Sequence, residues 1–157
     1  MVAMNRAFVK ESDQDTEILP ERAISPHPNL VTARGLAQLE ARVRELEAAR
    51  SAARAASDTA ELARVGRDLR YFQSRLESAR LVTPPAPARQ VRFGVRARLQ
   101  LADGSERSFQ LVGEDEADPK AGLISYMSPL ATAMMGKGVD DELPFGEHTA
   151  TIIAVES

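Results

Sequence analysis

The apolar residues of this chain change their spacing at one place, a proline-rich segment at residues 83–90. Before this segment apolar side chains recur every three or four residues, which is the period of an amphipathic helix. After it they alternate with polar side chains, which is the period of a half-buried strand. The change predicts an α+β protein with a helical part followed by a β-rich part.

The helical part, residues 30–82, carries two narrow apolar stripes. Thr32, a preferred N-cap residue, precedes the first stripe, and the second ends before Pro84. Each stripe can be buried only against the other, which predicts an antiparallel coiled-coil hairpin that turns near residues 56–59. Gly66 is a weak point of the second helix. The stripes are Leu36, Leu39, Val43 and Leu46, and then Leu62, Val65, Leu69, Phe72, Leu76 and Ala79.

Residues 91–157 have the features of a small antiparallel sheet. Alternation from Val91 to Leu101 is followed by Asp103-Gly104, a pair that favours a hairpin turn. Residues 123–127 and 149–155 predict further strands, and Pro129 opens a short predicted helix at residues 129–135. We therefore expect one small β domain with a short helix after the linker at residues 83–90.

Composition excludes several classes of protein. The chain has no cysteine, so disulfides and thiol nucleophiles are excluded, and His27 and His148 lack the spacing of metal ligands. No apolar run reaches membrane-spanning length, so we expect a cytoplasmic protein without a membrane partner. Residues 1–29 are acidic and lack apolar periodicity, which predicts a disordered tail. The basic middle and acidic ends fit either an oriented contact with a charged partner or an ordinary solvated surface.

Three blocks in the second part resemble the C-terminal domain of the bacterial Gre family of RNA polymerase secondary-channel factors. They are Val91-Arg92-Phe93-Gly94, residues 111–118 and residues 124–137. The resemblance implies an FKBP-like domain at residues 91–157 that anchors a monomeric factor on the rim of the polymerase secondary channel. Ser128 and Pro129, with Asp118 and Ser125, are the residues expected to contact the polymerase.

The resemblance also assigns a role to the hairpin turn. In the family, an Asp and a Glu three residues later help to hold the second magnesium ion of the polymerase active site, and the matching residues here are Asp58 and Glu61. Carboxylates are hard ligands that suit Mg²⁺. This implies a factor that promotes cleavage of backtracked transcripts by the polymerase, shares its Mg²⁺, binds no cofactor alone and is not itself an enzyme. The same Asp-x-x-Glu pattern is also a capping box, and the two roles can coexist.

One departure from the family pattern keeps an alternative open. Both arms of the predicted hairpin are shorter than those of the cleavage factors by roughly two to three turns, or ~10 to 15 Å. Leu62-Ala63-Arg64 also stands where the family has a more polar, Asn-containing stretch. The alternative is a non-cleaving regulator or competitor in the secondary channel, similar to the regulator of nucleoside diphosphate kinase.

Two further surfaces have two interpretations each. Arg50, Arg54, Arg64 and Arg67 fit either a contact with the 3′ end of nascent RNA or a solvated face, and the lack of interleaved aromatic residues favours solvation. Met134 and Met135 fit either a docking surface or core packing. Prolyl isomerisation, suggested by the FKBP resemblance, is rejected because residues 90–157 contain too few aromatic residues to line such a pocket.

Overall fold

The computed structural model describes residues 18–157, so most of the predicted tail lies outside the described residues. Two compact units are formed. The first contains residues 41–75 together with the described residues up to Ser25, and the second contains residues 26–40 and 76–157. The limits of these units differ from the domain boundaries predicted at residues 30 and 91. The start of the first helix and the end of the second helix belong to the same unit as the β-sheet. No helix among residues 18–157 is both long and apolar enough to cross a membrane.

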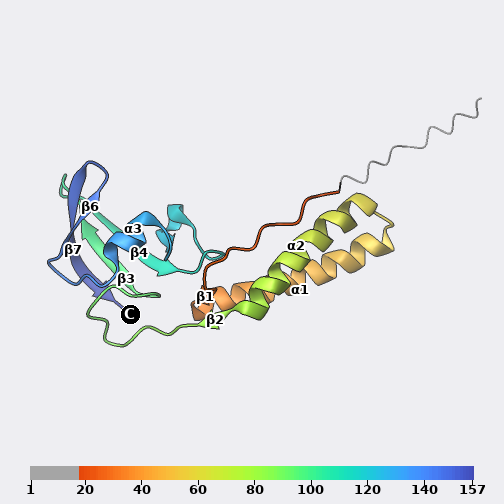
Figure 1. The fold of residues 1–157 in the computed structure, drawn as a ribbon, viewed down its shortest axis with the longest axis horizontal. Helices are drawn as coiled ribbons and strands as arrows, with labels where there is room; N and C mark the ends of the chain where they lie inside the picture. Colours follow the sequence, from red (N-terminus) through yellow and green to blue (C-terminus); the bar gives the residue numbers. More distant parts are fainter. Residues whose placement is uncertain (1–17) are drawn as a thin grey trace, which may run out of the picture. The chain divides into compact units, whose positions relative to one another are not determined.

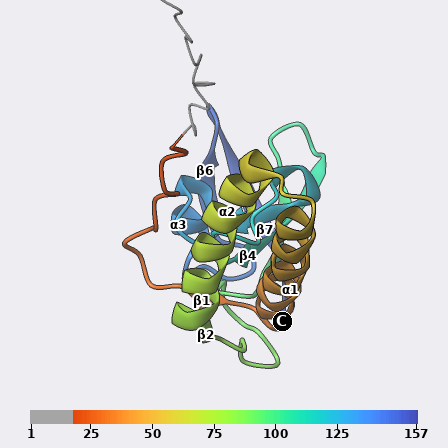
Figure 2. The ribbon, with the colours of Figure 1, turned by 90° about the vertical axis from the view of Figure 1, so that its right-hand side faces the viewer.

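The helical hairpin is present as predicted and consists of α1 (Ala33–Ala55) and α2 (Thr59–Ser78), which lie side by side in Figures 1 and 2. Thr32 caps α1, since its hydroxyl oxygen accepts a hydrogen bond from the Gly35 N–H at 3.0 Å. The central positions of both predicted stripes are buried, namely Leu39, Val43, Leu46, Val65 and Leu69. Burial of these side chains against one another holds the hairpin together.

Gly66 lies inside α2, where glycine weakens a helix, and the structure leaves room for a larger residue. A Cβ atom added at this position would come no closer than 3.4 Å to a side-chain atom, the Arg70 Nη1 atom. Gly66→Ala is therefore expected to raise the free energy of unfolding by about 0.5–1 kcal/mol, because alanine costs less backbone entropy in a helix. Chemical denaturation followed by circular dichroism at 222 nm measures this change. A loss of stability would show that Arg70 cannot yield the required space.

The β domain, where Figure 1 labels β3, β4, β6 and β7, contains a five-stranded sheet in the order β5-β4-β3-β7-β6. Its strands are β3 (Arg96–Gln100), β4 (Glu106–Val112), β5 (Leu123–Ser125), β6 (Glu142–Phe145) and β7 (His148–Glu156). All pairs are antiparallel except β4 with β5, which is parallel and so differs from the predicted all-antiparallel sheet. The parallel pairing is possible because the chain returns through a 3₁₀ turn, η1 (Pro119–Ala121), before β5 begins.

The core of this domain lies between the sheet and the short helix α3 (Pro129–Met134). Ala131 and Met134 of α3 are fully buried in it, together with sheet residues such as Leu99, Leu111 and Ile152. The structure thereby decides between the two interpretations of the methionines: Met134 is core, whereas the next residue, Met135, is 37% exposed. The predicted fold class, a helical hairpin followed by a small α+β domain, is confirmed.

A short parallel pair of strands joins the two ends of the hairpin and was not predicted. Strand β1 (Leu30–Val31) leads into α1, and β2 (Arg80–Leu81) follows α2. The loop after β4 packs closely on β1, because a Cβ atom at Gly113 would lie 2.3 Å from the Leu30 carbonyl oxygen. Glu116 of the same loop accepts a 2.7 Å hydrogen bond from the Thr32 hydroxyl and is almost fully buried. The second unit therefore includes the base of the hairpin as an integral part.

The described end of the predicted tail has definite contacts. Glu21 forms an ion pair with Arg70 of α2, and the guanidinium carbon of Arg22 lies 3.9 Å from the centre of the Tyr71 ring. Asn29 is buried and donates a hydrogen bond to the Ser78 hydroxyl at 3.2 Å. These contacts differ from the disorder that the sequence predicted as far as residue 29.

Candidate functional site

The hairpin turn holds the two carboxylates that the sequence singled out. Ser57 adopts the left-handed conformation (φ 53°), which reverses the chain after α1, and Asp58 follows it as the N-cap of α2. The Glu61 N–H donates to Asp58 Oδ1 at 3.0 Å, and the Leu62 N–H donates to the Asp58 carbonyl oxygen at 2.9 Å. These bonds show that Asp58 performs the capping role predicted for it, and its side chain is exposed.

Glu61 does not complete the capping box by bonding back to Asp58. Its two carboxylate oxygens instead accept hydrogen bonds from Arg64, one helical turn later, at 2.8 and 2.5 Å. The hydrogen bond from the Arg64 guanidinium holds the pKa of the Glu61 carboxyl below its usual value. Glu61 is therefore a charged carboxylate whose negative charge is already matched within the protein.

Both turn carboxylates have hydrogen-bond partners within the chain. Both Glu61 oxygens and one Asp58 oxygen accept hydrogen bonds from N–H groups of the chain. Mg²⁺ needs several oxygen ligands in near-octahedral geometry. Among residues 18–157, no group of three or more histidine, cysteine or acidic side chains is placed to hold a metal ion. Magnesium binding by Asp58 and Glu61 stays a prediction from the family resemblance.

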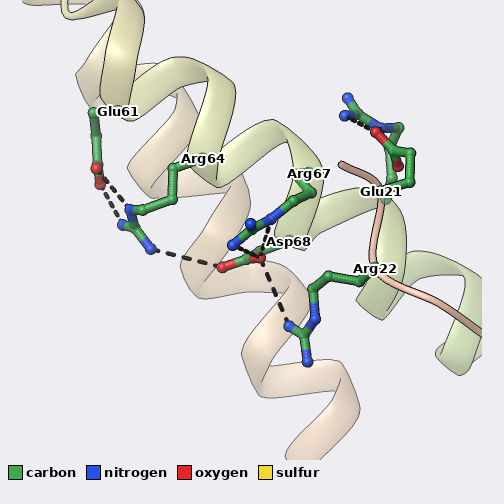
Figure 3. Close-up of polar contacts among 7 residues, drawn as sticks. Glu21, Arg22, Glu61, Arg64, Arg67 and Asp68 are labelled. Carbon is green, nitrogen blue, oxygen red and sulfur yellow. Dashed lines mark hydrogen bonds and ion pairs between the residues drawn. The ribbon is translucent and has the colours of Figure 1, made fainter. Parts of the chain in front are cut away.

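A buried carboxylate that the sequence analysis missed lies two turns further along α2. Asp68 is 6% exposed, and the guanidinium groups of Arg22, Arg64 and Arg67 all turn toward it (Figure 3). The N···O distances to Asp68 are 3.7 Å from Arg22, 3.6 Å from Arg64 and 3.1 Å from Arg67. Arg64 thus connects the carboxylate near the turn, Glu61, to the buried carboxylate, Asp68.

Only part of this Asp68 cluster could have been found from the sequence. Arg64 and Asp68 are four residues apart, a spacing that places oppositely charged side chains on one helix face. The spacing gives no sign that the carboxylate is buried. The third cation, Arg22, comes from a segment 46 residues earlier in the chain, and no local pattern predicts that contact.

The structure separates the four arginines that were predicted as one RNA-contacting set. Arg64 and Arg67 belong to the Asp68 cluster. Arg50 and Arg54 of α1 instead line a groove of about 260 Å³ on the hairpin, together with Arg70 of α2. We call this the arginine groove, and its other lining residues are Leu62, Gly66, Leu69 and Gln73. Three guanidinium groups around one hollow are suited to an anionic ligand.

The predicted docking residues of the β domain lie on consecutive segments from η1 to α3. Asp118 is exposed at the start of η1, and its backbone forms a bridge with Leu123 of β5. The Ser128 N–H donates to the Ser125 carbonyl oxygen at 2.9 Å, and the Ser128 hydroxyl caps α3 by accepting from the Ala131 N–H at 3.2 Å. Pro129 is exposed in the first turn of α3. Ser128 therefore has a structural role whether or not this surface binds a partner.

Comparison with known proteins assigns the family. A family model described as transcription elongation factor GreA/GreB, C-terminal part, matches residues 86–157. The chain is 39% identical over 151 residues to transcription elongation factor GreB of Xanthomonas axonopodis pv. citri, with 81% of this chain and 90% of that protein covered. GreB of Pseudomonas aeruginosa is 32% identical over 150 residues, with 81% and 89% covered. This chain belongs to the GreA/GreB family of transcription elongation factors.

Two solved structures are also similar, at low identity. Gfh1, a GreA factor homologue of Thermus thermophilus, matches with a TM-score of 0.41 and 19% identity, covering 83% of this chain and all of that one. A GreA/GreB factor from Nitrosomonas europaea matches with a TM-score of 0.42 and 19% identity, covering 82% and 98%.

The GreB relatives are longer than this chain within the aligned region. The match to the Xanthomonas protein extends over 151 residues but takes up only 81% of the 157 residues of this chain. The match to the Pseudomonas protein, over 150 residues and again 81% of this chain, has the same property. Within the matched stretch, these relatives therefore contain residues that have no counterpart here.

Proposed function

We propose that this chain is a Gre-family factor that docks on bacterial RNA polymerase at the secondary channel and regulates elongation without stimulating transcript cleavage. It acts in the bacterial cytoplasm as an accessory protein rather than an enzyme. The observation that carries the proposal is the state of the two turn carboxylates. Asp58 caps α2 through one carboxylate oxygen and both oxygens of Glu61 accept hydrogen bonds from Arg64, so a metal ion would have to compete with Arg64 for Glu61.

The length of the hairpin supports the same proposal. Helix α1 has 23 residues, which corresponds to about 35 Å at ~1.5 Å per residue. The GreB relatives contain residues without counterpart in this chain, which agrees with the shorter arms predicted from the sequence. A carboxylate that stops even one helical turn short of a metal ion cannot coordinate it, because Mg–O bonds are only about 2.0–2.1 Å long.

The remaining surfaces have roles that do not need catalysis. The segment from Asp118 to Pro129, with Met127 exposed beside the α3 cap, provides an adaptable surface for docking on the polymerase. Arg50, Arg54 and Arg70 in the arginine groove provide the contact with phosphate groups of RNA. A factor with these two surfaces occupies the channel entrance and competes there with other factors.

Adding the purified protein to a stalled, backtracked polymerase complex tests the proposal. We expect binding in a pull-down but a rate of RNA cleavage within about twofold of the intrinsic rate, since no carboxylate is delivered to the active-site metal. Asp58→Ala and Glu61→Ala should leave that rate unchanged. When a cleavage-competent GreB is also present, increasing amounts of this protein should slow cleavage by competition for the channel.

Two outcomes would contradict the proposal in different ways. Stimulated cleavage that is lost in both Asp58→Ala and Glu61→Ala would support the magnesium role that the family resemblance implies. No binding to the polymerase, by a protein whose circular dichroism shows the expected helices, would remove both the regulator and the cleavage factor.

A further inference from the structure

Residues 18–25, which precede β1 in the chain, run alongside α2 in the same compact unit (Figure 1). We call residues 18–25 the N-terminal strap. Two consecutive residues anchor it, and they do so with opposite charges. Both carboxylate oxygens of Glu21 accept hydrogen bonds from the Arg70 guanidinium, and their distances from Arg70 Nε are 3.2 and 3.1 Å. Arg22 stacks on Tyr71 and also faces Asp68.

Arg70 is the residue that the strap shares with the arginine groove. Its guanidinium lines the groove with Arg50 and Arg54, and the same guanidinium receives Glu21. Gly66 also lines the groove, and a Cβ atom added there would lie 3.4 Å from Arg70 Nη1. Engagement of the strap therefore neutralises one of the three positive charges around the groove.

Glu21 binds Arg70 in the manner in which a phosphate group would. A carboxylate and a phosphate both present two oxygens to the planar fork of a guanidinium, and both form paired, charge-assisted hydrogen bonds. The hydrogen bond from Arg70 also holds the pKa of the Glu21 carboxyl below its usual value, so Glu21 carries its negative charge at neutral pH. Both side chains are well exposed, 62% for Glu21 and 59% for Arg70, so the pair can open without disturbing a core.

We propose that the N-terminal strap is autoinhibitory, with Glu21 competing for Arg70 against the phosphate groups of single-stranded RNA. The proposal rests on the RNA contact assigned to the arginine groove above. In the closed state Arg50 and Arg54 are left to bind a phosphate group in the groove, and in the open state Arg70 joins them. Arg22 keeps the strap close by stacking on Tyr71, so Glu21 returns to Arg70 when RNA leaves.

The affinity of the full chain for RNA tests this competition directly. Fluorescence anisotropy with a short labelled oligouridylate should give about two- to fivefold tighter binding for Glu21→Gln than for the parent chain, the range expected when an exposed ion pair no longer competes. Glu45→Gln is the matched control, because Glu45 also accepts a hydrogen bond from an arginine, Arg42, but lies outside the groove. It should change the affinity much less. On an Arg70→Ala background, Glu21→Gln should have no effect.

A second measurement follows the strap without RNA. Trypsin cleaves after Arg22, and Glu21→Gln should accelerate that cleavage because one of the two anchors is lost. Equal RNA affinities for Glu21→Gln and Glu45→Gln, or an effect that persists with Arg70→Ala, would overturn the competition. Absence of RNA binding by every variant would also overturn it, while the pull-down with polymerase still decides the docking proposal separately.

Discussion

Gly113→Ala is expected to lower the free energy of unfolding by about 3 kcal/mol, the upper end of the cost of forcing an extra carbon into a packed region. The added Cβ atom would lie 2.3 Å from the Leu30 carbonyl oxygen, far inside the contact distance of the two atoms. That oxygen belongs to the backbone of β1, so no side-chain rotation can relieve the overlap. Strand β1 or the loop after β4 has to move.

Gly66→Ala is the matched control, because the same chemical change there meets only a side-chain atom at 3.4 Å, Arg70 Nη1, and should stabilise the protein. Urea unfolding curves of both variants, followed at 222 nm, should shift in opposite directions from that of the parent chain. A parent-like midpoint for Gly113→Ala would show that β1 is not held against the loop.

Asp68→Asn is expected to lower the free energy of unfolding by about 2 kcal/mol, because three guanidinium groups would then face a neutral amide at a largely buried position. This loss is smaller than that for a fully buried ion pair because the arginine side chains are 25–47% exposed, so water screens their charges. Loss of Asp68 should also release the strap, since Arg22 faces it. Trypsin cleavage after Arg22 should therefore accelerate in this variant.

Glu45→Gln again provides the control, because Glu45 pairs with Arg42 at 3.2 Å but is 67% exposed. A surface pair of this kind contributes less than about 0.5 kcal/mol on a helix. Thermal unfolding by circular dichroism should separate the two variants clearly. Equal stabilities would mean that burial of Asp68 contributes nothing to the hairpin.

The sequence predicted those features that depend on local spacing. The hairpin, its turn, the Thr32 cap and the Asp58 cap follow from apolar periodicity and from residues next to one another in the chain. The strand pair β1 and β2 could not be predicted, because two residues carry no period. The parallel pairing of β5 with β4 depends on the path of the intervening loop rather than on the pattern of either strand.

The candidate site was predicted less completely than the fold. The positions of Asp58 and Glu61 at the turn were correct, but the partner of Glu61 was not foreseen, because Arg64 competes with the backbone for the same carboxylate. Buried acids such as Asp68 and Glu116 contradict the general expectation that charged side chains are exposed. Their environments depend on residues 46 and 84 positions away, Arg22 and Thr32, and no local signal gives such contacts.

The pairing of β1 with β2 allows the length of the helical arms to change without a change at the base of the hairpin. The chain enters α1 and leaves α2 through adjacent residues, so equal insertions on the two sides of the turn would leave every contact at Leu30 and Arg80 as it is. One heptad added to each arm would preserve the apolar seam and displace the turn by about 10 Å. Duplication of a heptad on each side of the turn can thus change how far such a factor reaches while the β1–β2 pair stays the same.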